Sequence, residues 1–231
     1  NLFRDIEPNM TSVESAEENQ IVKLQMGDGD SAISQESNLD IEMTRDPAAV
    51  HRKGQQKTNM AGTKETQEME SYQVEEDGKT VIYSGTDEAW EKNAVEEKET
   101  SSQQTLLFDG LQNLSGAFSV SQDLATVNKE ECFELTGTIS GTQFQETFAD
   151  TLKALLGEDS SDLSGWNLQA SEDEENNEEL QQKLNNVKVD CVIDIYRSNI
   201  LPAKITFDLT DYLKAAGEEN AQVTSYTLEV T

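Results

Sequence analysis

Few side chains in this sequence have the types and spacing that catalysis requires. His51 is the only histidine, and it lies in a polar tract beside Arg52 and Lys53. A serine or cysteine nucleophile needs a histidine that is itself oriented by a carboxylate or amide, and no such set of residues accompanies His51. We therefore expect His51 to be a solvated surface side chain. The sequence predicts no catalytic residue and no enzyme.

Acidic side chains offer the only route to a metal site, because one histidine and two cysteines are too few for zinc. Asp28 and Asp30 have the early spacing of a calcium-binding loop. However, Ala32 and Ile33 stand where an EF-hand requires a ligand and a glycine. The sequence thus predicts no cofactor and no defined metal site, while loose calcium binding by Asp159, Asp162 or the acidic run at residues 171–179 stays open.

The overall charge narrows the classes of partner. The 231 residues include 46 acidic and 17 basic side chains, which gives a formal charge of -29. Such a surface repels nucleic acid phosphates and anionic membranes, so we expect no nucleic acid partner. No run of about 20 apolar residues is present, so no segment is expected to span a membrane. The charge suits a solvated protein outside the cell or one that meets cations, and it is also typical of a surface that only keeps a protein soluble.

Each of the two cysteines lies in a segment with the alternation of a β-strand. Cys132 shares the parity of Glu134 and lies opposite Leu135, whereas Cys191 is on the apolar parity of its own segment. If both strands belong to one sheet without a bulge, the two thiols point to opposite faces. A disulfide between them is then disfavoured, and we expect two inert strand cysteines.

The elements that would hold a binding site are organised around a hairpin at residues 187–209. Apolar side chains recur at every second position on both sides of a turn, namely at Val187, Val189, Cys191, Ile193 and Ile195, then at Ala203, Ile205, Phe207 and Leu209. Because side chains alternate faces along a strand, this pattern predicts two antiparallel strands that share one apolar face. A lone hairpin is marginal in water, so the pair must belong to a larger sheet.

Two helices have the amphipathic spacing needed to cover that face. The first, at residues 100–116, has a capping-box spacing at Ser101 and Gln104 and is weakened by Gly110. The second begins at Thr142, which has the same spacing to Gln145. The apolar side chains of the first helix are Leu107, Leu111 and Leu114, and those of the second are Phe144, Phe148, Leu152 and Leu155.

Further strands are expected before, between and after these helices. They lie at residues 33–45, 50–62, 69–74, 80–83, 118–120, 132–140 and 222–231. Asp77-Gly78 predicts a tight hairpin turn, and Trp90 is expected in a short loop. In the last strand Thr224, Tyr226, Leu228 and Val230 should share a face. Residues 1–30 are poorly patterned, although residues 21–26 fit a short helix or an edge strand.

This order of elements predicts an α+β fold, in which one curved antiparallel sheet carries two main amphipathic helices on its concave face. We expect residues 31–231 to form this single domain after the segment 1–30. The space between the layers is either a dry core or an apolar cavity for a ligand. The side chains that would line such a cavity are Leu107, Leu111, Phe144, Phe148, Leu152, Leu155, Val189, Cys191, Ile193, Ile205 and Phe207.

Several short motifs resemble bacterial lipoproteins of the LolA/LolB and LppX/LprG type. The hairpin has Asp194-Ile195-Tyr196 before its turn, and Pro202-Ala203-Lys204 leads into Ile205-Thr206-Phe207-Asp208-Leu209 after it. The segment at residues 72–90, followed by Trp90-Glu91-Lys92, is similar to uncharacterised Gram-positive members. A strand at residues 132–141 that leads into a helix is similar too. The resemblance covers residues 31–231.

The resemblance implies a half-barrel of about nine to eleven antiparallel strands wrapped around helices. It also implies a lipid or acyl-chain ligand in the cavity and a place outside the cytoplasm, on the surface of a Gram-positive bacterium. The membrane would be reached through a lipid anchor on a cysteine upstream of Asn1, because this chain has no such cysteine near its start. The alternative is a cell-surface interaction or structural module with a filled core. Its protein partner would meet the acidic loop at residues 158–182 or an exposed strand edge.

Overall fold

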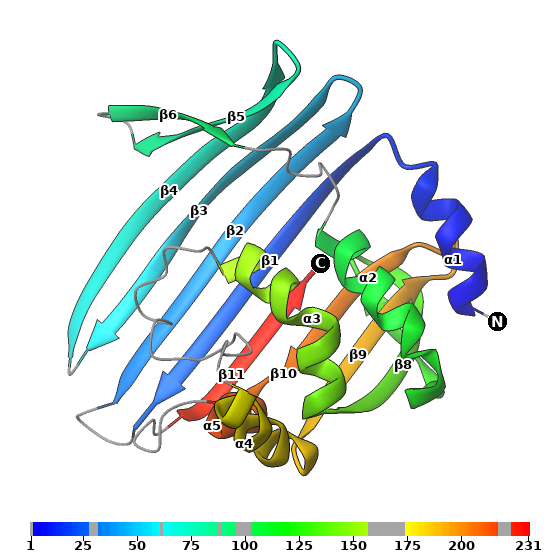
Figure 1. The fold of residues 1–231 in the computed structure, drawn as a ribbon. Coiled ribbons are helices and arrows are strands. Elements are labelled where there is room, and N and C mark those ends of the chain that lie inside the picture. Colours follow the sequence, from blue (N-terminus) through cyan, green and yellow to red (C-terminus); the bar gives the residue numbers. More distant parts are fainter. Residues whose placement is uncertain are drawn as a thin grey trace.

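The computed structural model describes residues 2–27, 32–60, 62–86, 89–95, 103–156, 174–216 and 223–231. Its main element is one sheet of eleven strands in the order β6-β5-β4-β3-β2-β1-β11-β10-β9-β8-β7. All neighbouring strands are antiparallel. The first six strands and the last five therefore form two meanders, which meet where β1 pairs with β11 (Figure 1).

The first meander is mostly polar, and its first four strands are long, with 12 to 14 residues each. Its strands are β1 (Ser15–Met26), β2 (Ile33–Arg45), β3 (Ala48–Met60), β4 (Thr63–Glu76), β5 (Lys79–Thr86) and β6 (Ala89–Val95). The strands of the second meander are more apolar: β7 (Phe118–Val127), β8 (Glu130–Ser140), β9 (Lys188–Tyr196), β10 (Pro202–Asp208) and β11 (Val223–Val230). The helices are α1 (Leu2–Thr11), α2 (Gln103–Asn113), α3 (Gly141–Leu156), α4 (Glu174–Asn185) and α5 (Thr210–Ala216), with a 3-10 turn at Ser115–Ala117.

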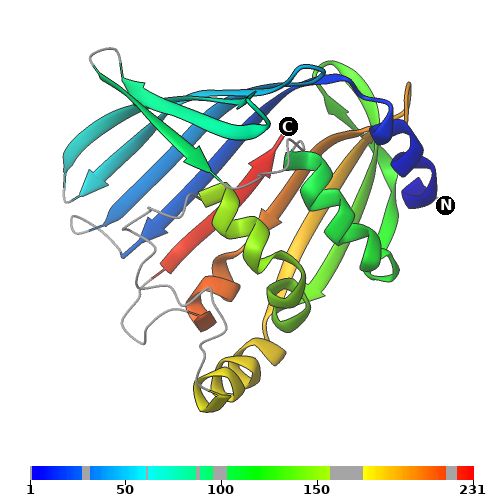
Figure 2. The ribbon, with the colours of Figure 1, turned by 45° about the horizontal axis from the view of Figure 1, so that its top comes forward.

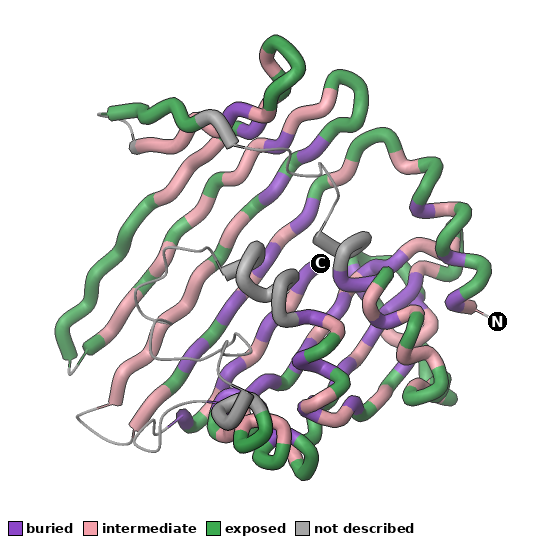
Figure 3. The backbone as a smooth tube through the Cα atoms, viewed as in Figure 1, coloured by how far each residue is buried: buried purple, intermediate pink, exposed green. Residues whose placement is uncertain are grey.

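The helices cover only one part of the sheet. Contacts join α2 to β10, α3 to β8 and β9, and α5 to β9 and β11. The sheet is curved, and these helices lie on its concave side (Figures 1 and 2). At the other end of the sheet, β5 and β6 fold back over the same side (Figure 2). Burial is densest beneath the helices and decreases toward β3 and β4 (Figure 3).

The predicted α+β half-barrel is confirmed, and so is the hairpin around which it was expected. β9 and β10 pair in the register Ile193↔Ile205 and Cys191↔Phe207. These side chains point to the helices and are buried in the main core. The turn between β4 and β5 is confirmed as well, because Asp77 and Gly78 have φ values of 52° and 73°, the positive values that a two-residue hairpin turn needs.

Residues 2–26, for which the sequence predicts no definite element, form α1 and β1. β1 lies between β2 and β11, so residues 21–26 are neither a short helix nor an edge strand. The pattern is hidden because polar residues occupy both faces of this strand, including the buried Glu18 and Gln20. Helix α1 joins the main core through Phe3, whose ring stacks on that of Phe108 at 5.4 Å between centroids.

Three local predictions are wrong. Trp90 lies in β6 and not in a loop. In β11 the predicted face is formed by Tyr226, Leu228 and Val230, but Thr224 is exposed and Val223 is buried instead, because the register shifts beside Gln25 and Met26 of β1. A bulge of this kind reverses the face to which the following side chains point. The strand predicted at residues 118–120 is also longer, because β7 runs from Phe118 to Val127.

The capping box of the second helix is formed two residues earlier than its spacing suggested. The Ser140 hydroxyl accepts the Gln143 N–H at 3.2 Å, and Gln143 Oε1 accepts the Ser140 N–H at 3.3 Å. This exchange fits a strand that ends at Ser140 and a helix that begins at once. The expected pair is used elsewhere, since Thr142 Oγ1 bonds Asn185 Oδ1 at 2.9 Å.

Gly110 has low helix propensity, but it has a packing role in the folded protein. A Cβ atom at this position would overlap the ring of Phe148 and come within 2.9 Å of Thr147 Cγ2. The absent side chain thus allows α2 and α3 to approach closely above the sheet.

The cysteines follow the prediction. Cys132 and Cys191 are both free and buried, and they belong to separate clusters on opposite faces.

Candidate functional site

The predicted cavity residues lie together in the core under the helices. All of those whose side chains the structure describes belong to one cluster, and none is more than 1% exposed. They are Leu107, Leu111, Phe144, Phe148, Val189, Cys191, Ile193, Ile205 and Phe207. The side chains of Leu152 and Leu155 lie outside the described residues. The sequence therefore identified a group that the fold brings together, and its part in lining a ligand cavity stays a prediction.

Aromatic rings fill the centre of this cluster. Phe148 lies 5.2 Å from Phe144 and 5.4 Å from Phe207 between ring centroids, and Phe144 lies 5.4 Å from Phe207. Tyr212 of α5, which sequence reasoning missed, is 4.9 Å from Phe144. Its hydroxyl donates a hydrogen bond to Gln145, and burial raises the pKa of this hydroxyl. Tilted and edge-on rings at such distances pack closely, so helix α3 is fixed to the sheet here.

A second part of the concave face is built differently. The register places Ile41 of β2 opposite Glu18 of β1 and Arg52 of β3. Side chains that are directly opposite share a face, so these three belong to the side on which Val22 and Leu24 of β1 meet the core. Next to them is a smaller apolar cluster, formed by Ile41, Met43 and Val50 with Ala16 and Leu39 against it.

Buried polar side chains surround this smaller cluster. Glu18, Gln20 and Gln73 are only 6%, 3% and 3% exposed. Arg52 is half-buried, and its Nη1 donates to Gln73 Oε1 at 3.4 Å. Burial lowers the pKa of Arg52, while the negative charge of Glu18 acts in the opposite direction. Apolar surface with a few converging polar groups is the usual composition of a ligand site.

Sequence reasoning missed this group, although one signal for it was present. The tract at residues 50–62 is polar on both parities, so its pattern predicts no buried face. However, the turn at Asp46-Pro47 sets the pairing of β2 with β3. Counting back from that turn would have placed Arg52 opposite Ile41, on the apolar face.

The convex face carries an aromatic row that includes His51. The rings of His51 and Tyr72 stack at 4.3 Å with an interplanar angle of 3°, and Tyr72 lies 5.7 Å from Trp90. His51 Nε2 is 2.8 Å from Glu70 Oε1, a contact that lowers the pKa of Glu70. His51 is therefore a partly exposed surface side chain, and its ring is held between Glu42 of β2 and Tyr72 of β4.

Asp194 is a buried carboxyl group on the convex side of β9. It is 4% exposed, and its Oδ1 has no hydrogen-bond partner. Burial raises the pKa of Asp194, Lys204 opposes this effect, and Glu134 and Glu229 add to it. A raised pKa in the folded state favours folding below the unfolded pKa. That contribution is lost as the pH rises through the folded pKa.

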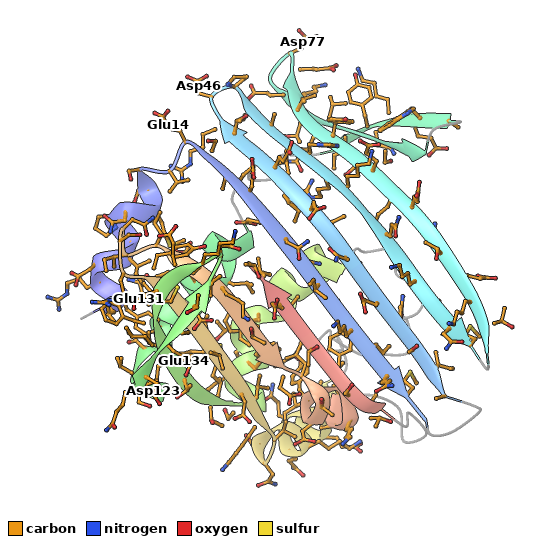
Figure 4. All side chains as sticks on the ribbon, turned by 180° about the vertical axis from the view of Figure 1, so that it is seen from behind. Glu14, Asp46, Asp77, Asp123, Glu131 and Glu134 are labelled. Carbon is orange, nitrogen blue, oxygen red and sulfur yellow. The ribbon has the colours of Figure 1, made fainter. Side chains whose placement is uncertain are left out.

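Asp194→Asn should therefore stabilise the protein at pH 7, by about 1 kcal/mol, because it removes the cost of burying an ionised carboxylate. Urea denaturation between pH 4 and 8 measures this effect, and the gain should grow as the pH rises. Asp123→Asn, at an exposed carboxylate of β7 (Figure 4), removes the same charge and should leave stability nearly unchanged. A loss of stability in Asp194→Asn at pH 7 would show that Lys204 outweighs burial.

Acidic side chains occupy both ends of the convex surface. Glu14, Asp46 and Asp77 lie at the turns on one end, while Asp123, Glu131 and Glu134 lie over β7 and β8 (Figure 4). Among the residues that the structure describes, no three carboxylate, cysteine or histidine side chains gather closely enough to hold a metal ion. Within the same part of the chain, no helix is long and apolar enough to cross a membrane.

Comparison with known proteins gives a family and distant structural likenesses. Residues 1–227 match DUF6612, which is described as a family of unknown function. No curated protein has a matching sequence. The structure is similar to that of LprF from Mycobacterium bovis, with 11% identity over 100% of this chain and 89% of that chain and a TM-score of 0.45.

The second likeness is to a beta-barrel-like protein of the family DUF1849 from Brucella abortus. It has 11% identity over 95% of this chain and 97% of that chain, with a TM-score of 0.23. Both TM-scores are too low to support an inference about function. What the chain binds must be argued from its own side chains.

Proposed function

Because the chain belongs to the DUF6612 family, whose function is unknown, we propose its function from its own residues: it is a binding protein that holds a lipid or other apolar ligand between sheet and helices. It acts outside the cytoplasm, as a lipoprotein-type protein of the bacterial cell surface. The formal charge of -29 suits a well-solvated protein outside the cell. An apolar ligand needs a concave surface that removes it from water, and the curved sheet supplies one.

One observation carries the proposal, which is the mixed lining of the concave face beside the filled core. Ile41, Met43 and Val50 are apolar and buried, whereas Glu18 and Gln73 on the same face are buried and polar. A face that served only as core would gain nothing from these polar groups, because each must lose its hydration on burial. A ligand with a long apolar part and one polar end matches both kinds of side chain.

In the proposed complex the ligand lies along β1 to β3, and the helix-covered cluster with Phe148 and Phe207 forms the adjoining wall. β1 links the two regions, because its Val22 and Leu24 belong to the main core while Gln20 lies on the same face toward the smaller cluster. Those residues predicted from the sequence whose side chains the structure describes thus keep a role as the wall and end of the site.

Displacement of a neutral fluorescent probe tests this proposal. We expect N-phenyl-1-naphthylamine to bind the purified protein with enhanced fluorescence and to be displaced by amphiphiles with an oleoyl chain. Native mass spectrometry after gentle purification should show a co-purified apolar molecule. Leu39→Asp places a charge beside the smaller cluster and should weaken probe binding about tenfold or more, because a desolvated charge opposes an apolar ligand.

Asn38→Asp is the matched control for this experiment. It adds the same charge to the neighbouring residue, which is exposed on the convex face, and it should leave probe binding unchanged. Equal loss of binding in both variants would point to a general effect of charge. An absence of any probe binding or displaceable amphiphile in the unmodified protein would contradict the proposal.

One observation supports the alternative function, a cell-surface interaction module: the convex aromatic row of His51, Tyr72 and Trp90. Tyr72 and Trp90 are 40% and 45% exposed, and exposed aromatic side chains are enriched at protein interfaces. This function predicts a protein partner whose binding weakens steeply with salt, because the surface is acidic. It predicts no displaceable lipid, so the same displacement experiment separates the two functions.

A further inference from the structure

The basic side chains of the sheet are distributed very unevenly between its two faces. In the strands that the structure describes, the pairing register places nearly every Lys and Arg on the convex face. These are Lys23, Lys53, Lys57, Lys64, Lys79, Lys92, Lys188 and Lys204. Among the basic residues of these described strands, only Arg45 and Arg52 lie on the concave face, so each of them requires an explanation.

Arg45 is explained by helix α1. Its Nη1 donates to the carbonyl oxygen of Thr11 at 2.6 Å, and its Nη2 donates to that of Met10 at 3.4 Å. The last carbonyl groups of a helix lack hydrogen-bond partners within the helix. A basic side chain at this end donates to those carbonyl groups and interacts favourably with the negative end of the helix dipole. Arg45 therefore fixes α1 to the end of β2, and Arg52 is the concave cation that no helix end accounts for.

Arg52 has hydrogen-bonding capacity that the described residues leave unused. A guanidinium group carries five N–H donors, and within the described part of the chain it makes one bond, of 3.4 Å, to Gln73 Oε1. Glu18 is near enough to attract the charge, but burial has the larger effect and lowers the pKa of Arg52. The described residues thus offer this charge one long hydrogen bond, from Gln73, and one nearby carboxylate, that of Glu18.

Buried apolar side chains begin directly beside this guanidinium group. Arg52 pairs with Ile41 on one side and with Ser71 on the other, and Val50 lies two residues before it on the same face. A planar fork of donors suits the two oxygens of a carboxylate or phosphate. A cation at the border of an apolar cluster therefore matches a ligand with an acyl chain and an anionic end.

We propose that Arg52 binds the anionic head group, carboxylate or phosphate, of an amphiphile whose chain lies over Ile41, Met43 and Val50. This inference rests on the proposed function and specifies its ligand class. The acidic surface of the protein opposes anions in general, so such a ligand is retained only where a buried donor group receives it. If Arg52 were only a structural partner of Glu18, it would affect stability and leave ligand choice unchanged.

A set of ligands with one chain and different head groups tests the inference on the unmodified protein. Oleate, 1-oleoyl-lysophosphatidate, 1-monooleoylglycerol and oleylamine are each titrated against bound N-phenyl-1-naphthylamine at pH 8. Oleate or the lysophosphatidate, or both, should bind about tenfold more tightly than the monooleoylglycerol, as expected for a charged, partly buried hydrogen-bonded pair. Comparison of these two distinguishes a carboxylate from a phosphate ligand. Oleylamine should bind least.

Substitutions then assign the preference to one side chain. Arg52→Gln should abolish the preference for the anionic head group while monooleoylglycerol still binds, and Arg52→Lys should restore part of it. Lys57→Gln is the control, because it removes the same charge from the exposed convex side of β3. It should leave the preference intact. Thermal unfolding of each variant shows whether it is folded.

The outcomes separate this inference from the proposed function. Equal affinities for oleate, the lysophosphatidate and monooleoylglycerol would overturn the anionic head group and leave the binding function standing. No displacement by any of the four ligands would overturn both. If Arg52→Gln does not fold, the head-group comparison on the unmodified protein decides the matter. A preference that survives in folded Arg52→Gln would also exclude Arg52 as its cause.

Discussion

Replacement of Phe148 by alanine is expected to lower the free energy of unfolding by about 3 to 5 kcal/mol. The Phe148 side chain has no exposed surface and contacts Phe144 and Phe207. It also lies against Gly110, so α2, α3 and the sheet all lose a contact when the ring is removed. The measurement is urea denaturation followed by circular dichroism, with the slope of the transition checked for two-state behaviour.

The control for this prediction is Val120→Ala in β7, because the Val120 side chain is 55% exposed. It should change stability by less than about 0.5 kcal/mol. A loss of under 1 kcal/mol for Phe148→Ala would contradict the close packing described here. In that case solvent or a ligand would already occupy part of the space around the ring, and the cavity predicted from the sequence would lie there.

Gly54→Ala is expected to cost about 3 kcal/mol, at the upper end of the range for overpacking. A Cβ atom on Gly54 would overlap the carbonyl oxygen of Asn38 and lie 2.8 Å from the Cα atom of Leu39. Both neighbours belong to the backbone of β2, so β2 and β3 would have to separate to accept it. The melting temperature and the urea midpoint should both fall.

The matched control is Gly116→Ala, because a Cβ atom at Gly116 meets nothing within 4 Å. This variant should retain the stability of the unmodified protein. If Gly54→Ala were as stable as the control, the close contact between β2 and β3 would be relieved by a small shift of either strand. The smaller concave cluster that Leu39 helps to form would then be less rigid than its burial suggests.

The parts of the fold that the sequence predicted are those in which one face is apolar and the other polar. Strands β9 and β10 and the stripe containing Phe144 and Phe148 have this property, so alternation alone assigned them to the core. Their partners could not be assigned in the same way. Tyr212 lies in the short helix α5, and the sequence there fits a turn as well as a helix. Its ring nevertheless packs against Phe144 in the centre of the core.

The parts that were missed have polar residues on both faces. Glu18 and Gln20 interrupt the apolar side of β1 and hide a central strand. Arg52 is a single charged residue in a polar tract, and only the register with β2 assigns it to the concave face. The capping box was misplaced because Ser140-Gln143 and Thr142-Gln145 have equal spacing, and the end of β8 decides between them.

The pairing of β1 with β11 also sets an order of assembly. Of the strands in this sheet, β1 is the first in sequence and its neighbour β11 is the last. Pairing over so great a separation along the chain is slow, so we expect this pair to form after the hairpins within each meander. Until it forms, the unpaired edge of β1 is where misassembly with a second chain would begin. Completion of the C-terminal strand is thus the event that joins the two meanders into one shell.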